Sequence, residues 1–121
     1  MQDRRVPGSR RYYITSPQRE WRPPTDVYET DDAIVVKVEI PGMHEDDFAI
    51  TMSDRRLVIS GSRPEPEERL SYHNMEIQYG PFRAEVRVSV NLQEDAIEAS
   101  YDGGFLYVRL PLARVRRIPI S

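Results

Sequence analysis

The sequence predicts an all-β protein, a sandwich of two antiparallel sheets that share their apolar faces. Several short segments alternate apolar and polar residues with a period of two. Turn signals such as Pro-Gly and Gly-Gly recur at short spacing between these segments. No stretch of useful length keeps the 3.6-residue period of a helix. At 121 residues, the chain has room for one domain with a modest core.

We expect three parts: an arm over residues 1–22, a domain over 23–111 and a tail over 112–121. The arm is rich in Arg, Pro, Gly and Ser and shows no sustained period, which is typical of a flexible segment. Its aromatic residues are the exception, because they could be buried against a partner or an unfolded chain. These candidate client-binding residues are Tyr12, Tyr13 and Trp21. A disordered arm without a binding role fits the pattern equally well.

The first strands of the domain follow Pro23-Pro24. A short strand is expected at residues 26–30, and a longer one at 33–40 places alternate Ile and Val side chains on one face. Residues 48–53 alternate again, with Phe48, Ile50 and Met52 on the apolar face, and residues 57–60 return antiparallel. A tight Asp54-Arg55 turn is expected between them, with Met52 opposite Leu57 and Ile50 opposite Ile59. The alternative is a looser turn, because an Arg is unfavourable at positive φ.

Residues 61–81 form a long, charged segment that contains proline. Loops of this length are uncommon in a compact domain unless they have a function. Leu70, Ser71 and Tyr72 could form a short strand on this loop. The next strand is expected at residues 82–90, where apolar side chains alternate once more.

A hairpin over residues 97–110 is the most secure element. Its centre is Gly103-Gly104, and glycine enters positive φ without a steric penalty. The resulting register places Ile97, Ala99 and Tyr101 opposite the apolar residues Leu110, Val108 and Leu106. On the other face it sets Glu98 across from Arg109, a pair of opposite charges.

The tail ends in Ile118-Pro119-Ile120. Proline pushes the residue before it into an extended conformation, so the two Ile side chains point to the same side. Burial of two Ile side chains contributes roughly 3–6 kcal/mol gross. Ordering reduces this gain, so one tail binds weakly and several act together. The alternative is a frayed terminus with incidental apolar residues.

Five motifs, in this order, resemble those of the small heat-shock proteins, the α-crystallin-domain family. They are Asp26-Val27-Tyr28-Glu29, Val38-Glu39-Ile40-Pro41-Gly42-Met43, Leu57-Val58-Ile59-Ser60-Gly61, Ala99-Ser100-Tyr101-Asp102-Gly103-Gly104-Phe105-Leu106 and Ile118-Pro119-Ile120. The resemblance implies an immunoglobulin-like sandwich that dimerises by strand exchange, with Leu70, Ser71 and Tyr72 as the exchanged strand. Two departures are an Ala at position 84, where the family often has Arg, and a short N-terminal arm.

The resemblance also implies that the tail docks in a groove between two edge strands of a neighbouring copy. Edge strands accept extended partners by β-augmentation. The expected plug is Ile118, Pro119 and Ile120. The candidate groove residues are Phe48, Ile50, Met52, Ile97, Ala99 and Tyr101.

Composition argues against several other functions. The formal net charge of −3 argues against a nucleic-acid binder. The chain has no cysteine, no apolar run long enough to span a membrane and no signal-peptide core at its start, so we expect a cytoplasmic protein. We expect no metal and no cofactor, because His44 and His73 are isolated and no phosphate-binding glycine run is present. No catalytic constellation supports an enzyme.

The expected function is an ATP-independent chaperone that holds partly unfolded proteins and prevents their aggregation under stress. Its expected partners are unfolded clients and further copies of itself. The alternative is a binding module of the CS co-chaperone type, which docks one folded partner. The Ile-Pro-Ile tail and the long loop favour the first class, since modules of the second class are usually monomeric and need neither feature.

Overall fold

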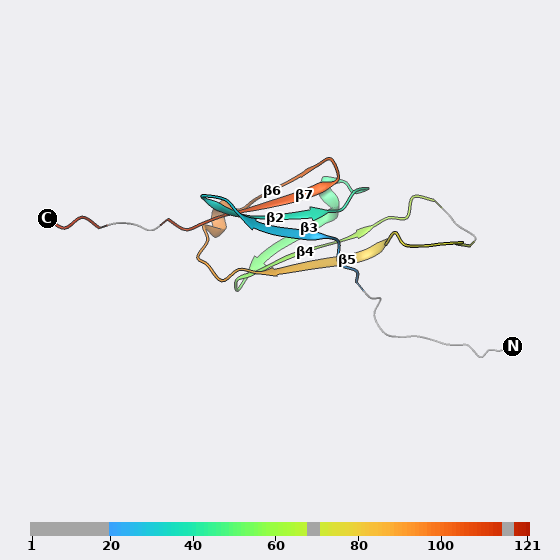
Figure 1. The fold of residues 1–121 in the computed structure, drawn as a ribbon, viewed down its shortest axis with the longest axis horizontal. Coiled ribbons are helices and arrows are strands. Elements are labelled where there is room, and N and C mark those ends of the chain that lie inside the picture. Colours follow the sequence, from blue (N-terminus) through green and yellow to red (C-terminus); the bar gives the residue numbers. More distant parts are fainter. Residues whose placement is uncertain (1–19, 68–70, 115–117) are drawn as a thin grey trace.

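The computed structural model of this chain describes residues 20–67, 71–114 and 118–121. The described residues form β-strands and two short 3₁₀ helices (Figure 1). The strands are β1 (Thr25–Glu29), β2 (Ala33–Glu39), β3 (Phe48–Ser53), β4 (Arg56–Arg63), β5 (Gly80–Arg87), β6 (Glu98–Asp102) and β7 (Phe105–Pro111). The 3₁₀ helices are η1 (Glu45–Asp47) and η2 (Glu94–Ala96). The expected all-β class is confirmed.

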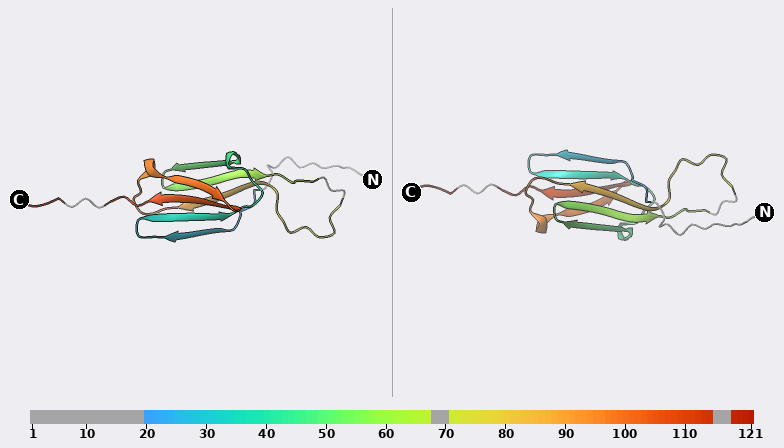
Figure 2. Two further views of the ribbon diagram at one scale, coloured as in Figure 1. Left: turned by 90° about the horizontal axis from the view of Figure 1, so that it is seen from above. Right: turned by 90° about the horizontal axis from the view of Figure 1, so that it is seen from below.

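The strands form one sheet of order β1-β2-β7-β6 and a second sheet of order β3-β4-β5. All of the ladders within them are antiparallel. The sheets stack face to face in an elongated sandwich (Figure 2). The loop between β4 and β5 extends from one end, and the chain after β7 leaves at the opposite end. This order makes β1, β3, β5 and β6 the edge strands.

The core lies between the sheets and is filled by the alternating side chains that the sequence indicated. Its fully buried members include Val36, Val38, Ile40, Leu57, Ile59, Phe82, Ala84, Val108 and Leu110. At the position where the related family often has Arg, the Ala84 side chain faces the opposite sheet with no exposed area. The neighbouring Arg83 points outward and pairs with Glu85.

The ends of β4 and β5 differ from the expected ones. β4 continues to Arg63, and β5 runs from Gly80 to Arg87 rather than over residues 82–90. The Val88 amide donates to the Arg55 carbonyl at 2.9 Å, so the backbone pairing continues for one position past the end of β5. The β6–β7 register is the expected one from Glu98 to Asp102. Ile97, however, precedes β6 and is not paired with Leu110.

The expected tight turn at Asp54-Arg55 is confirmed, and the looser alternative is not adopted. Both residues have positive φ, 54° and 63°, and join β3 to β4 as a tight two-residue turn. Its strain is offset by the hydrogen bond from Val88 and by one from Arg55 Nη2 to Asn91 Oδ1 at 2.9 Å. The β3–β4 register, with Ile50 opposite Ile59, is the expected one.

Candidate functional site

The candidate site is a groove between β3 and β6, edge strands of different sheets. Each belongs to a hairpin, so one wall is held by β4 and the other by β7. Between the walls lies a cavity of about 140 Å³. It is lined by Glu45, Phe48, Ile50, Ala99, Ser100, Tyr101 and Leu106. The structure therefore brings together four of the six candidate groove residues, namely Phe48, Ile50, Ala99 and Tyr101.

Two aromatic rings fix one end of the groove. Phe48 on β3 and Tyr101 on β6 lie with ring centroids 5.2 Å apart, tilted by 54°, and Phe48 also contacts the buried Phe82. The Tyr101 hydroxyl donates to the Ile40 carbonyl at 2.7 Å and accepts from the Met43 amide at 3.4 Å. Because its hydroxyl is held on both sides, Tyr101 keeps a fixed orientation. No sequence pattern indicated the partners of this hydroxyl.

The other two candidate residues lie outside this cavity. Met52 and Ile97 are partly buried and pack against the core. Met52 follows Ile50 further along β3 on the same face, while Ile97 immediately precedes β6. Along β6 itself, Glu98, Ala99 and Ser100 are exposed. The outer flank of β6 is therefore open to an incoming extended segment.

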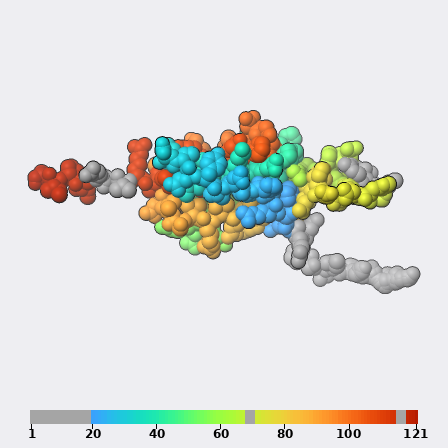
Figure 3. Space-filling model, viewed as in Figure 1, coloured from blue at the N-terminus to red at the C-terminus, as the bar shows by residue number. Residues whose placement is uncertain are grey.

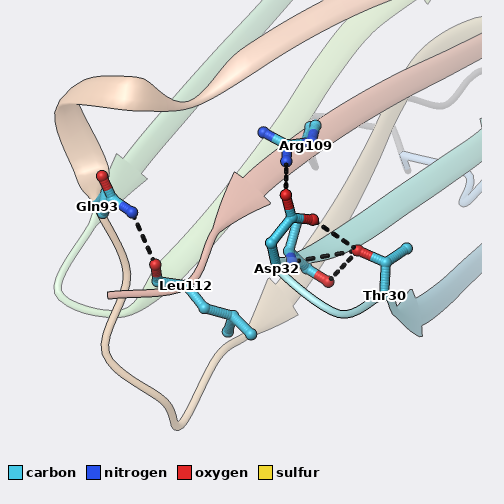
Figure 4. A network of polar contacts seen from close by, with 6 residues as sticks. Thr30, Asp32, Gln93, Arg109 and Leu112 are labelled. Atoms are coloured by element: carbon cyan, nitrogen blue, oxygen red, sulfur yellow. Dashed lines mark hydrogen bonds and ion pairs between the residues drawn. The ribbon is translucent and has the colours of Figure 1, made fainter. Parts of the chain in front are cut away.

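The tail starts from a fixed root, formed by Pro111, Leu112 and Ala113. The Gln93 side chain donates to the Leu112 carbonyl at 2.8 Å (Figure 4). The Leu112 amide donates to the Asp32 carbonyl at 2.9 Å, and the Ala113 amide donates to the Asn91 carbonyl at 3.0 Å. Further on, Ile118 and Ile120 are 82% and 99% exposed, so the expected plug is solvent-facing in the single chain.

Arg109 contributes to the same corner through Asp32. The two side chains form an ion pair at 2.8 Å, and the Thr30 hydroxyl donates to the same Asp32 carboxylate (Figure 4). The predicted hairpin register sets Arg109 across from Glu98, and the structure does place them opposite. The guanidinium instead contacts Asp32, in the turn between β1 and β2.

The loop between β4 and β5 shows no strand in the single chain over its described residues 71–79. Ser71 is exposed, as are the large side chains of Tyr72, Met75 and Ile77. Leu70 lies outside the described residues, so the expected exchanged strand stays a prediction. The arm residues Tyr12 and Tyr13 also lie outside the described part of the chain.

Trp21, expected as part of the arm, contacts the sandwich in the structure. Its backbone bridges Phe82, and its indole nitrogen donates to the Gly80 carbonyl at 3.2 Å. The Arg63 guanidinium lies 4.7 Å from the Trp21 ring centroid. An aromatic residue placed just before Pro23-Pro24 was the only signal in the sequence for this contact.

Within residues 20–67, 71–114 and 118–121, no group of three His, Cys, Asp or Glu side chains is arranged to hold a metal ion. The same described residues include no helix that is long and apolar enough to cross a membrane.

The sheet order, the buried alternating core and the open slot between β3 and β6 define an α-crystallin-type β-sandwich with a surface suited to an extended chain. Residues 26–121 match the model of the Hsp20/alpha crystallin family. The chain therefore belongs to the small heat-shock protein family, the first of the two classes expected from the sequence.

Individual relatives agree with this assignment. Small heat shock protein C2 of Rickettsia felis is 33% identical over 101 residues, which cover 82% of this chain and 66% of the relative. Heat shock protein HSP.16.4 of Streptococcus thermophilus is 36% identical over 102 residues, covering 80% of this chain and 70% of the relative. This chain spans 66%, 64% and 42% of the first three curated relatives that it matches.

Solved structures show the same fold. A small heat-shock protein from Xylella fastidiosa has a TM-score of 0.70 at 25% identity, covering 85% of this chain and 99% of that one. HSP18.5 from E. histolytica has a TM-score of 0.69 at 29% identity, covering 84% of this chain and 98% of that one. Members of the family are ATP-independent holdase chaperones and not enzymes.

Proposed function

We propose that this chain is an ATP-independent holdase that binds apolar segments of partly unfolded proteins and keeps them from aggregating. The observation that carries the proposal is an open groove between two edge strands on a protein that also exposes an Ile-Pro-Ile segment. A flank that accepts one extended segment can accept another, since β-augmentation uses backbone hydrogen bonds and pockets for alternate side chains. Membership of the small heat-shock family supports this activity.

In this proposal the tail of one copy docks in the groove of another. Ile118 and Ile120 are exposed, and Pro119 holds them on one side of an extended segment. Each docked tail is weak on its own, but several tails in one assembly reinforce one another through effective concentration. Assembly and client capture then compete for the same apolar surface.

The dimer is proposed to form by strand exchange through the loop between β4 and β5. The natural acceptor is β1, an edge strand at the far side of its sheet from β6. Its Val27 and Tyr28 side chains are 50% and 45% exposed, so this edge offers apolar surface to an added strand. Leu70, Ser71 and Tyr72 of the partner would add to this edge. The Xylella fastidiosa relative is described as having a distinct high order structure, which supports an assembled state.

The activity is tested by heating an aggregation-prone client with this protein in the absence of nucleotide. Sub-stoichiometric amounts should suppress the rise in light scattering, and serum albumin at the same mass concentration serves as the control. Unchanged scattering would exclude a holdase. A chain that acts as a docking module for one folded partner would also leave the scattering unchanged.

The tail is tested separately by native mass spectrometry. Replacing Ile118→Ala and Ile120→Ala should shift the assembly toward dimers, because each docked tail loses most of its apolar contact. The matched control is Arg114→Ala, on the exposed linker. The same mass distribution in both variants would show that the tail does not contribute to assembly.

We also propose that the protein acts in the cytoplasm. Family membership alone does not decide this, because one relative, from Solanum lycopersicum, is named as chloroplastic. Fractionation of cells that express the full chain, followed by detection in the soluble cytoplasmic fraction, tests the location.

A further inference from the structure

A second cavity lies at the base of the loop between β4 and β5, at the end of the sandwich opposite the tail root. We call it the loop-base pocket. Its lining residues are Pro41, Gly42, Arg63, Pro64, Pro66, Ile77 and Tyr79. The cavity measures about 330 Å³, which is at the lower end of the range of roughly 300–1,000 Å³ typical of ligand sites. Its proline rings, the Tyr79 ring and the 62%-exposed Ile77 make it a surface for an apolar or aromatic side chain.

Arg63 gives this pocket its fixed shape. Its Nε donates to the Gln78 carbonyl at 3.0 Å and its Nη1 donates to the Pro41 carbonyl at 3.3 Å, so both ends of the loop are tied to the turn after β2. The guanidinium also lies over the Tyr79 ring, at 5.3 Å from its centroid. A half-buried guanidinium that already lies beside aromatic rings attracts further aromatic groups.

The N-terminal arm starts beside this pocket. Arg63 stacks on Trp21 as well as on Tyr79. The Trp21 amide donates to the Pro81 carbonyl at 3.1 Å, which fixes the point from which residues 1–20 depart. Figure 3 shows the blue residues near position 20 against the yellow residues at the base of the loop. The arm is therefore present near the pocket at a high effective concentration.

Charge favours the same pairing. The arm of residues 1–22 carries six Arg against one Asp and one Glu, whereas residues 64–79 carry four Glu against one Arg. On the described loop, the Glu65 and Glu76 carboxylates accept hydrogen bonds from the neutral side chains of Tyr72 and Asn74. Their negative charge is thus still available to a cationic segment.

We propose that the arm of the same chain folds back so that Tyr12 and Tyr13 dock in the loop-base pocket. Arg10 and Arg11, which directly precede the two tyrosines, then lie along the acidic loop. Tyr13 is eight residues from Trp21, a span of up to roughly 26–29 Å when extended, which exceeds what the return requires. Ser16-Pro17 lies midway, and this pair favours a turn.

Docking brings the arm into contact with the loop between β4 and β5. It covers Ile77 and Tyr79 and places the arm's aromatic residues out of reach of a client until the arm is released. The docked state is sensitive to salt, because part of its stability comes from exposed charges that salt screens.

The test is hydrogen exchange of the full-length protein, followed by mass spectrometry of peptides that cover residues 63–67 and 76–80. The double variant Tyr12→Ala and Tyr13→Ala should raise exchange at the loop base about tenfold, since removal of a buried ring shifts an opening equilibrium by at least that factor. The matched control is Tyr12→Phe and Tyr13→Phe, which keeps both rings and should retain the protection. Equal exchange in the two double variants overturns the proposal.

A second variant tests the pocket side. Ile77→Ser alters an exposed residue, so the sandwich should remain folded, and exchange of peptides from residues 8–16 should rise. Unchanged exchange of the arm would count against the pocket as its binding site. Protection that grows with protein concentration would show that a neighbouring copy supplies the arm, which overturns the same-chain assignment. The readout requires no client, so it stands apart from the holdase assay.

Discussion

The two hairpins that form the walls of the groove make the same turn with different residues. In the β6–β7 hairpin, Gly103 and Gly104 have φ values of 58° and 85°. In the β3–β4 hairpin, Asp54 and Arg55 have φ values of 54° and 63°. Glycine adopts such angles freely, whereas other residues lose roughly 1–2 kcal/mol each.

The difference shows where each wall obtains its register. In the β6–β7 hairpin, the Gly103-Gly104 pair is sufficient by itself to set the register. The Asp54-Arg55 turn depends on the segment after β5, because the Val88 amide and the Asn91 side chain both bond to Arg55. One wall of the groove is therefore determined by adjacent residues and the other by residues more than thirty positions away.

The largest effect is expected at Gly104. Gly104→Ala should lower the free energy of unfolding by about 2 kcal/mol, because a Cβ there adds strain at positive φ and meets the Pro41 Cβ at 3.1 Å. The matched control is Gly103→Ala, where nothing lies within 4 Å of the added Cβ, and the expected loss is about 1 kcal/mol. Urea denaturation measures both. Equal losses would show that contact with Pro41 has no energetic weight.

A smaller effect is expected at the aromatic end of the groove. Tyr101→Phe keeps the ring against Phe48 but removes the hydroxyl that donates to the Ile40 carbonyl. The expected loss is about 1 kcal/mol, the typical net value of one such hydrogen bond. Tyr107→Phe, on the outer face of the neighbouring strand, is the control for loss of a tyrosine hydroxyl. Equal thermal stability of the two variants would show that the hydrogen bond from Tyr101 to the Ile40 carbonyl does not stabilise the fold.

A third substitution places a glycine in the strained turn between β3 and β4. Arg55→Gly should raise the free energy of unfolding by about 0.5 kcal/mol, because relief at positive φ exceeds the loss of an exposed hydrogen bond to Asn91. Asn91→Ala, which removes only that hydrogen bond, should be slightly destabilising. If Arg55→Gly destabilises the protein as well, positive φ at position 55 does not strain the turn.

The smallest effect is expected at Glu85, which ties the residue after this turn to β5. Arg83 donates to its carboxylate and lowers its pKa below the usual range, and Arg56 lowers the pKa further. A carboxyl with a lowered pKa stabilises the folded state above its ordinary pKa and loses this effect as pH falls through the folded-state pKa. Glu85→Gln should therefore be slightly less stable than wild type near pH 7 and equal to it in acid. A stability difference between the two proteins that grows toward low pH would contradict a lowered pKa of Glu85.

Sequence reasoning succeeded where the signal is local. The period-two alternation placed Val36, Val38 and Ile40 in the core, and Gly103-Gly104 set the register of β6 against β7. The same register put Ala99 and Tyr101 on the apolar face of the hairpin. The resemblance to the family made them candidate groove residues, and both line the cavity between β3 and β6.

The missed features depend on residues that are distant in sequence. The Tyr101 hydroxyl finds its acceptor 61 positions away, and the Trp21 indole finds its acceptor 59 positions away. The role of Arg63 in tying the loop to the sandwich could not be predicted, because its acceptors are backbone carbonyls, which have no sequence signature. The partners that stabilise the Asp54-Arg55 turn, Val88 and Asn91, were missed for the same reason, because they lie beyond β5.

The fastened root of the tail sets a limit on distances between subunits. Leu112 and Ala113 are bonded to the sandwich, so only the five residue steps from Ala113 to Ile118 are available as a tether. A fully extended tether of that length spans at most roughly 17–18 Å. In the proposed tail-linked assembly, the root of one subunit and the groove of its neighbour must therefore lie within this radius.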